Sequence, residues 1–357
     1  MNKLKKIGLT ALGTSLVASS AIAADATVTG NTGYTWSSEE VGTSTTDGIG
    51  FEADFNMSVS GEMDNGWTAT GSLLLTESAG LSSSYTSLTM GSLGTIIVGS
   101  GYGGVGQAFD DVTPKAYEEN HDGMKTSTAI DNVGANMGNG SLMYFGPTVD
   151  LGGFGVQVMA GYAPEASNTA VTDGGVSTSS NLWSSGKDLG VKINYAGLTA
   201  GAYASELQKD SSDSVTDNDA MSATWHASYT TGPVSFGYQV GGYDNGLAGA
   251  AAPATTAAAT LAASTGTFEF EKMSVAFNVN ENFSISWAEL EEVYDDQSNV
   301  ASGTEIANVT MESTSIQFAY TMGSMSIKGY QTDTDNPGWD SDAQSDEITE
   351  IAINFAF

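Results

Sequence analysis

The last eight residues, Glu350-Ile351-Ala352-Ile353-Asn354-Phe355-Ala356-Phe357, place large apolar side chains at every second position. Side chains of a β-strand point alternately to its two faces, so this period of two predicts a strand with one apolar and one polar face. The same alternation recurs in segments 51–60, 273–279 and 316–322. Counting such segments gives about sixteen, within two, after residue 27. The chain is therefore expected to be all-β and antiparallel.

The connections between these segments alternate between short and long. Short turns such as Asp64-Asn65-Gly66 and Ala196-Gly197 carry the residues that hairpin turns favour. Long polar segments, such as 207–218, 244–265 and 295–307, lie between them. A meander of this kind has one end with tight turns and one end with long loops. We infer that the two ends face different compartments.

The N-terminus has the features of a secretory signal. Its positive residues are Lys3, Lys5 and Lys6. A short apolar stretch, 7–18, and the small-x-small sequence Ala21-Ile22-Ala23 follow. The apolar stretch is much shorter than the ~20 residues that a spanning helix needs. We expect residues 1–23 to be a signal peptide that is removed, and residues 24–357 to form one exported β-barrel domain.

The composition limits the possible partners. Acidic residues outnumber Lys and Arg by 42 to 10, for a formal net charge of −32, and all ten cations are Lys. So acidic a chain repels phosphate backbones, which excludes nucleic acid as a partner. The absence of Cys excludes disulfides and thiolate metal sites.

An exported antiparallel meander can be a soluble sheet protein or a membrane barrel. About sixteen strands make a barrel too wide for side chains to fill, so its polar faces can line water while its apolar faces contact lipid. Unpaired strand edges cannot face lipid, so such a sheet must close. We therefore expect a transmembrane antiparallel β-barrel of about 16 strands.

Aromatic residues near both ends of the strands suggest interfacial girdles. Beside the short turns these are Trp67, Phe154, Tyr195, Tyr229, Phe283 and Phe357. Beside the long loops they are Trp36, Tyr162, Tyr203, Tyr243 and Tyr294.

Three stretches carry a family resemblance. The terminal strand ends in Phe357, preceded at alternate positions by Phe355 and Ile353, and segments 94–99 and 140–145 are short apolar strands in the expected order. With these features the mature chain resembles the Gram-negative outer-membrane porins of the 16-stranded, trimeric general-diffusion type. The resemblance implies that the terminal strand is the signal read by the barrel-assembly machinery. It also implies a homotrimer in the cell outer membrane, in contact with its lipid and lipopolysaccharide.

In that family the third long loop folds inward and constricts the pore. The matching segment here is about 100–138, and its acids are Asp110, Asp111, Glu118, Glu119, Asp122 and Asp131. The family usually places arginines on the wall opposite the loop, but this chain has no Arg. By strand parity, the lumen wall is expected to carry Glu52, Asp54, Lys192, His226, Lys328 and Glu350. Lys192, Lys328 and Lys272 are the candidates to replace the missing arginines.

The expected function is passive diffusion of ions and small hydrophilic solutes across the outer membrane. Rings of carboxylates attract cations and repel anions, so we expect a preference for cations that weakens in high salt. No cofactor is expected.

Three other functions compete with that of a diffusion channel. A barrel hydrolase needs a histidine beside a nucleophile, but His121 and His226 lie in no recognisable motif, so we expect no enzyme activity. A secreted calcium-binding surface protein would use acids such as Asp333 and Asp335, although the segment fails the EF-hand pattern. A substrate-specific channel would line its path with aromatics, and Tyr330 is one of few on the lumen-facing parity. Loose calcium binding at Asp333 and Asp335 stays open.

Overall fold

The computed structural model describes residues 25–76, 80–100, 104–119, 129–133, 137, 140–166, 183–209, 219–244, 246, 266–295 and 308–357. The expected signal peptide, 1–23, lies outside the described residues. Almost every described element is a strand. The strands are β1 (Asp25–Val41), β2 (Ser44–Glu62), β3 (Thr68–Leu75), β4 (Leu81–Thr89), β5 (Thr95–Ser100), β6 (Ser141–Phe145), β7 (Val149–Leu151), β8 (Phe154–Ala163), β9 (Trp183–Tyr195), β10 (Leu198–Lys209), β11 (Ala220–Thr231), β12 (Val234–Asp244), β13 (Thr267–Asn280), β14 (Phe283–Asp295), β15 (Val309–Met322), β16 (Met325–Asp335) and β17 (Asp346–Ala356).

Within the residues that the structure describes, three short 3₁₀ helices interrupt the connections between strands. They are η1 (Gly91–Leu93), η2 (Val105–Ala108) and η5 (Pro337–Trp339). In the part of the chain that the structure describes, no helix combines the length and apolar character required to cross a membrane.

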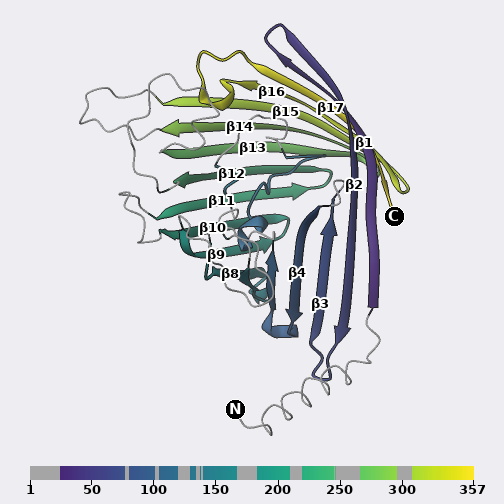
Figure 1. Cartoon of the computed structure of the whole chain (residues 1–357), viewed down its shortest axis with the longest axis vertical. Helices are drawn as coiled ribbons and strands as arrows, with labels where there is room; N and C mark the ends of the chain where they lie inside the picture. Colours follow the sequence, from purple (N-terminus) through teal and green to yellow (C-terminus); the bar gives the residue numbers. More distant parts are fainter. Residues whose placement is uncertain are drawn as a thin grey trace, which may run out of the picture.

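The strands form one closed sheet in which neighbours in sequence are antiparallel neighbours in space. β6 and β7 both pair with β8, so together they make one barrel strand that is interrupted at 146–148. β1 pairs with both β2 and β17, which closes the sheet (Figure 1). The Gly30 and Phe357 backbones exchange two hydrogen bonds, of 3.2 and 2.8 Å, at this closure. The predicted antiparallel barrel of 16 strands is confirmed.

The short turns gather at one end of the barrel. In an antiparallel meander every second connection lies at the same end, and the short turns are these alternate connections. Gly66, Gly197, Gly232 and Gly323 have φ values of 79°, 87°, 55° and 63° in these turns. Positive φ costs glycine little, since it has no Cβ. The strand ends that flank the longer connections lie at the opposite end, as the alternation of loop lengths predicts.

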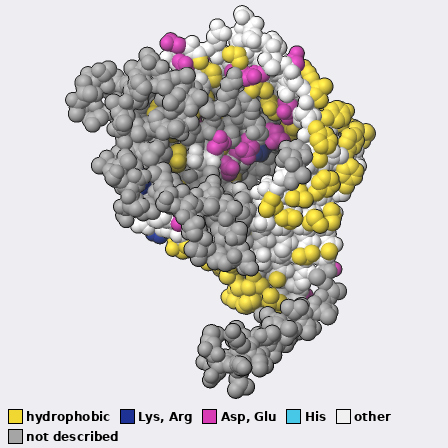
Figure 2. Space-filling view, viewed as in Figure 1, with side chains coloured by type: hydrophobic (Ala, Val, Ile, Leu, Met, Phe, Trp, Pro, Cys, Tyr) yellow, Lys and Arg dark blue, Asp and Glu magenta, His cyan; other side chains and the backbone are white. Residues whose placement is uncertain are grey.

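The two faces of each strand differ in polarity. In β13, Lys272 and Ser274 are 1% and 2% exposed, whereas Met273 and Phe277, which point the other way, are 41% and 38% exposed. The same alternation around the barrel gives an outer face rich in exposed apolar side chains and a polar inner face. Figure 2 shows apolar side chains on the outer wall and acidic side chains around the central hollow.

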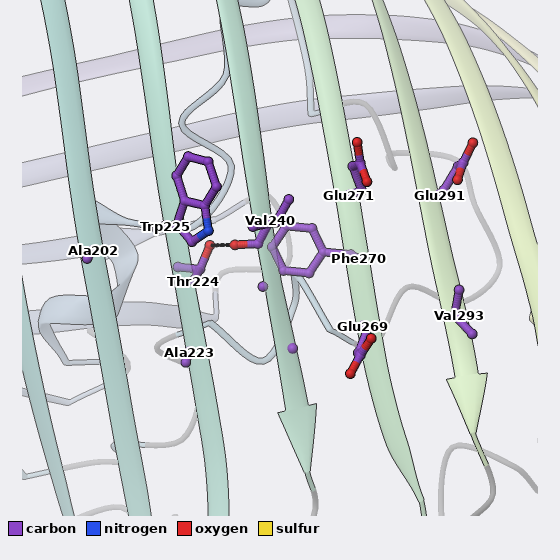
Figure 3. Close-up of a pocket in the computed structure, with 12 residues that line it drawn as sticks. Ala202, Ala223, Thr224, Trp225, Val240, Glu269, Phe270, Glu271, Glu291 and Val293 are labelled. Carbon is purple, nitrogen blue, oxygen red and sulfur yellow. Dashed lines mark hydrogen bonds between the residues drawn. The ribbon is translucent and has the colours of Figure 1, made fainter.

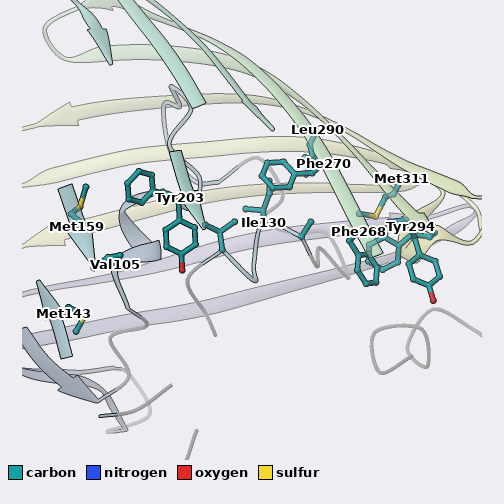
Figure 4. Packing of buried hydrophobic residues seen from close by; sticks show 14 of the residues in the cluster. Val105, Ile130, Met143, Met159, Tyr203, Phe268, Phe270, Leu290, Tyr294 and Met311 are labelled. Atoms are coloured by element: carbon teal, nitrogen blue, oxygen red, sulfur yellow. The ribbon is translucent and has the colours of Figure 1, made fainter. Parts of the chain in front are cut away.

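A buried hydrophobic cluster lies on part of the inner face, formed by wall residues and the connection after β5 (Figure 4). Phe268 stacks on Tyr294 with ring centroids 4.7 Å apart, and Trp339 of η5 lies 4.9 Å from Phe268. This cluster lines the interior at the long-loop end.

The prediction that Tyr203, Tyr243 and Tyr294 belong to an outer aromatic girdle is therefore wrong. Tyr203 and Tyr294 are only 3% and 6% exposed and belong to the interior cluster, against which Tyr243 packs. Trp36 and Tyr162, in contrast, are 41% and 46% exposed on the outer face. Closeness to a loop does not settle orientation, because strand parity decides which face a side chain occupies. Since these three tyrosines lie inside, the inner face carries more aromatic side chains than expected from the sequence.

Candidate functional site

Residues 104–119, called the loop segment below, follow β5 and contact inner-face side chains of strands from β9 to β17. At one end the Val105 amide donates to the Asp188 carboxylate of β9, at 3.0 Å. At the other end the Tyr117 hydroxyl donates to Glu350 of β17, also at 3.0 Å. A connection that leaves β5 can reach this series of polar side chains only from inside the barrel. The loop segment therefore lies along the interior wall.

Two wall glutamines hold the backbone of the loop segment. The Gln239 amide nitrogen of β12 donates to the carbonyls of Phe109 and Asp110, at 2.9 and 2.8 Å, and its oxygen accepts from the Val112 amide at 3.3 Å. Gln317 of β15 repeats this pattern. It donates to the Glu118 carbonyl at 2.8 Å and accepts from the Tyr117 amide at 3.0 Å.

Each glutamine thus pairs with the loop backbone through both its donor and its acceptor. Irregular backbone in the interior needs such partners, because an unpaired buried amide or carbonyl is costly. Gln239 and Gln317 are 0% and 2% exposed. Strand parity alone is sufficient to place both on the polar face, but it gives no sign of this role.

A buried ion pair fixes the middle of the loop segment. Lys272 of β13 contacts the Asp111 carboxylate, and the two side chains are 1% and 0% exposed. Lys115 lies 3.6 Å from the same carboxylate and 3.4 Å from Glu119, and it is 31% exposed. The charge of Asp111 is therefore offset by lysines, and this carboxylate serves to hold the loop segment against the wall.

The Phe109 ring occupies a pocket in the wall, with 0% exposure. Lys192 Nζ lies 5.0 Å from its centroid, and the His226 ring lies 6.0 Å away. A Cβ on Gly190 would lie 2.3 Å from the Phe109 ring, so the absence of a side chain at this position makes room for it.

Tyr117 makes a second aromatic contact with the wall. Lys328 Nζ lies 5.0 Å from the Tyr117 ring centroid. Burial, together with the Glu350 carboxylate, raises the pKa of the Tyr117 phenol. The phenol therefore remains a hydrogen-bond donor to Glu350 throughout the neutral range.

The wall formed by β2, β1 and β17 carries a carboxylate that has neutral hydrogen-bond partners. The Glu52 carboxylate accepts hydrogen bonds from the side-chain amides of Asn31 and Asn354, the latter at 3.2 Å. Asp54 lies two residues further along the same face of β2 and is half-buried. Glu52 differs from Asp111, since its amide donors leave the carboxylate charge uncompensated.

The outer face also carries carboxylates, but they lie outside the barrel interior. Glu271, Glu291, Glu312 and Asp335 are directly opposite one another on β13, β14, β15 and β16. Figure 3 shows Glu271 and Glu291 beside a shallow groove that Trp225 also lines. Both glutamates share a face with exposed Met273 and Trp287, so this groove belongs to the outer surface and is no part of an interior passage.

The structure thus brings most predicted site residues to one interior region. Asp110, Asp111, Glu118 and Glu119 lie on the loop segment. All six predicted wall residues lie on the inner face, and Lys192, His226, Lys328 and Glu350 surround Phe109 or Tyr117. Asp131 lies in the separate described stretch 129–133, and Asp122 is outside the described residues. Phe109, Tyr117 and the two asparagines were not predicted to have these contacts.

The predicted calcium acids are not part of this region. Asp333 and Asp335 lie on the outer face of β16, where Asp335 accepts a hydrogen bond from Ser345. Within the described ranges, no group of three or more His, Cys, Asp or Glu side chains is arranged to hold a metal ion. Calcium binding at these acids stays a prediction.

The terminal residues of the predicted assembly signal lie at the closure of the barrel. Phe355 and Phe357 are 36% and 76% exposed, and Ile353 pairs with Tyr34 of β1. Their recognition by the assembly machinery stays a prediction.

Comparison with known proteins agrees with this architecture. The chain resembles the anion-selective porin from Comamonas acidovorans, with a TM-score of 0.64, 13% identity, and coverage of 94% of this chain and 100% of that one. It also resembles Salmonella typhi OmpF in complex with daunomycin, with a TM-score of 0.68, 10% identity, and coverage of 93% and 97%. A third similar structure is the outer-membrane channel DcaP of Acinetobacter baumannii, with a TM-score of 0.60, 13% identity, and coverage of 95% and 99%.

A search of curated protein sequences gave no match. The family model described as Gram-negative porin matches residues 8–357, which is nearly the whole chain. The chain therefore belongs to the Gram-negative porin family, and it is a multi-pass β-barrel of the outer membrane.

Proposed function

We propose that this porin is a non-enzymatic, general-diffusion channel that prefers cations over anions. The observation that carries the proposal is the different pairing of interior charges. The Lys272 charge is offset by Asp111, whereas the Glu52 carboxylate accepts hydrogen bonds from two neutral amides. The charge that remains uncompensated at Glu52 is negative.

Such a channel needs no moving part. Small hydrophilic solutes diffuse down their gradients between the wall and the loop segment, which we propose narrows the passage. Carboxylates along the path raise the local concentration of cations and lower that of anions. The effect reaches about 10 Å at 0.1 M salt and about 3 Å at 1 M, so the preference weakens as salt increases.

The similar porin from Comamonas acidovorans is described as anion-selective. At 13% identity the shared fold does not carry its charge pattern to this chain. Selectivity is set by the side chains that line the passage, so two barrels of one fold can prefer ions of opposite sign.

The test is a reversal potential across a planar bilayer that contains the purified protein. With a tenfold KCl gradient, we expect the potential to have the sign of cation selectivity, and to move toward zero when both salt concentrations are raised. A potential of the opposite sign would refute the cation preference.

We also propose that the functional unit is a homotrimer that contacts outer-membrane lipid and lipopolysaccharide and is inserted by the barrel-assembly machinery. The family assignment and the exposed apolar outer face support this proposal. Chemical crosslinking of the protein in isolated outer membranes should give a product that stops at three chains. A product that stops at one chain would contradict the trimer.

A further inference from the structure

Glu52 is held in an unusual way on the inner wall. Glu52 of β2, Gly33 of β1 and Asn354 of β17 lie in register on three adjacent strands. Because Gly33 has no side chain, the Glu52 carboxylate reaches across β1 to Asn354 Nδ2 at 3.2 Å. A Cβ on Gly33 would lie 2.1 Å from Asn354 Oδ1, so any larger residue would disturb this contact.

The second oxygen of the same carboxylate accepts a hydrogen bond from Asn31 of β1. Donors on two strands therefore fix both oxygens of Glu52. Both donors are neutral amides, so the carboxylate is oriented without losing its charge. A carboxylate that is held in one position presents its field at a fixed point of the wall.

Glu52 also lies at the edge of the loop segment. The last described wall contact of the loop segment is the hydrogen bond from Tyr117 to Glu350 of β17, and β17 is separated from β2 only by β1. The Glu52 charge acts on the Tyr117 phenol. Solutes that pass between the end of the loop segment and the β1–β2 wall must therefore pass Glu52.

We propose that Glu52 is the main residue that determines the charge selectivity of this porin, with Asn31 and Asn354 as its positioning residues. The permeating species that it favours are small hydrated cations. This inference rests on the proposed preference for cations and assigns it to one carboxylate.

The first test replaces Glu52→Gln, which keeps the shape of the side chain and removes its charge. A unit charge about 5 Å from a passing ion changes the local ion concentration about twofold to fourfold in water at 0.1 M salt. The charge raises the cation concentration and lowers the anion concentration by this factor, so we expect the ratio of cation to anion permeability to fall about fourfold to sixteenfold. The matched control is Glu312→Gln, which removes one charge from the outer face and should leave the ratio unchanged.

The second test uses the absence of cysteine from the natural chain. Glu52→Cys gives a single thiol, which can be modified in the folded channel with charged methanethiosulfonate reagents. A negatively charged reagent should restore the cation preference, and a positively charged one should reduce it further. Since both reagents act on the same inserted channel, a failure to fold cannot imitate this result.

The positioning role has its own readout. Asn354→Ala should lower the permeability ratio by less than Glu52→Gln does. The double variant should match Glu52→Gln alone, because the asparagine acts only through the carboxylate.

The outcomes separate the two proposals. If the natural channel prefers cations but Glu52→Gln leaves the ratio unchanged, or the thiol does not react, the inference about Glu52 is overturned and the proposed function stands. If the natural channel shows no cation preference, the proposed function fails at its first measurement.

Discussion

Lys272→Met tests how firmly the loop segment is held against the wall. The change leaves the Asp111 carboxylate, which is 0% exposed, without its closest cation. Loss of one partner from a buried ion pair typically costs about 3–5 kcal/mol. Lys115, 3.6 Å from the carboxylate and 31% exposed, can return about 1 kcal/mol. The expected loss of docking free energy is therefore about 2–4 kcal/mol, which lowers the docked population relative to the undocked one by about 30-fold to 900-fold.

The other contacts should keep the loop segment docked for much of the time. Gln239 and Gln317 together make five hydrogen bonds to its backbone, each worth on the order of 1 kcal/mol. We therefore expect a channel that inserts normally but whose loop segment detaches and returns. Single-channel recording should show brief steps to higher conductance that the natural protein lacks.

Two further variants make this result decisive. Lys272→Met/Asp111→Asn removes both charges, keeps an oxygen to accept the Thr113 hydrogen bond at 3.0 Å, and should give recordings nearly as quiet as those of the natural protein. Lys187→Met removes an exposed lysine from the outer face of β9 and should have no effect. Equal noise in the single and double variants would refute the reasoning, since an unpaired buried charge would then not be its source.

Three other predictions follow from the same structure. Gly190→Ala should displace the Phe109 ring and increase current noise, because the new Cβ would lie 2.3 Å from the ring; Gly61→Ala, where a Cβ meets nothing within 4 Å, should not. Cation preference should weaken on acidification, because protonation removes the negative charge of carboxylates along the path; an unchanged reversal potential in acid would contradict this. Deletion of Phe357 should lower the amount of heat-modifiable barrel in the outer membrane, because it removes two backbone hydrogen bonds to Gly30; normal assembly of the truncated chain would show that this closure is dispensable.

The alternation of side chains along the sequence was sufficient to predict most of the barrel. The terminal strand Glu350–Phe357 shows one apolar and one polar face, and the tight turns predict which strands are neighbours. Strand parity also placed Glu52, Lys192 and Glu350 on the polar face, because side-chain direction in a strand is a local property.

Strand parity is also sufficient to place Tyr203 and Tyr294 on the inner face. Their nearness to long loops suggested a girdle instead, and the structure shows that this local cue is misleading. The proposed negative sign of the interior charge, in contrast, is favoured by composition, because acids outnumber lysines by 42 to ten.

Only the tertiary structure decided which interior residues meet. Lys272 and Asp111 are 161 positions apart, and Glu52 and Asn354 are 302 apart. Their contacts depend on the path of the connection after β5 and on the stagger at which β1 closes against β17. Both are properties of the whole sheet, because a shift of one residue at any strand pair would carry every later side chain to a different height and face. Local periodicity therefore predicts the wall, whereas the charges that meet across it are determined only when the barrel closes.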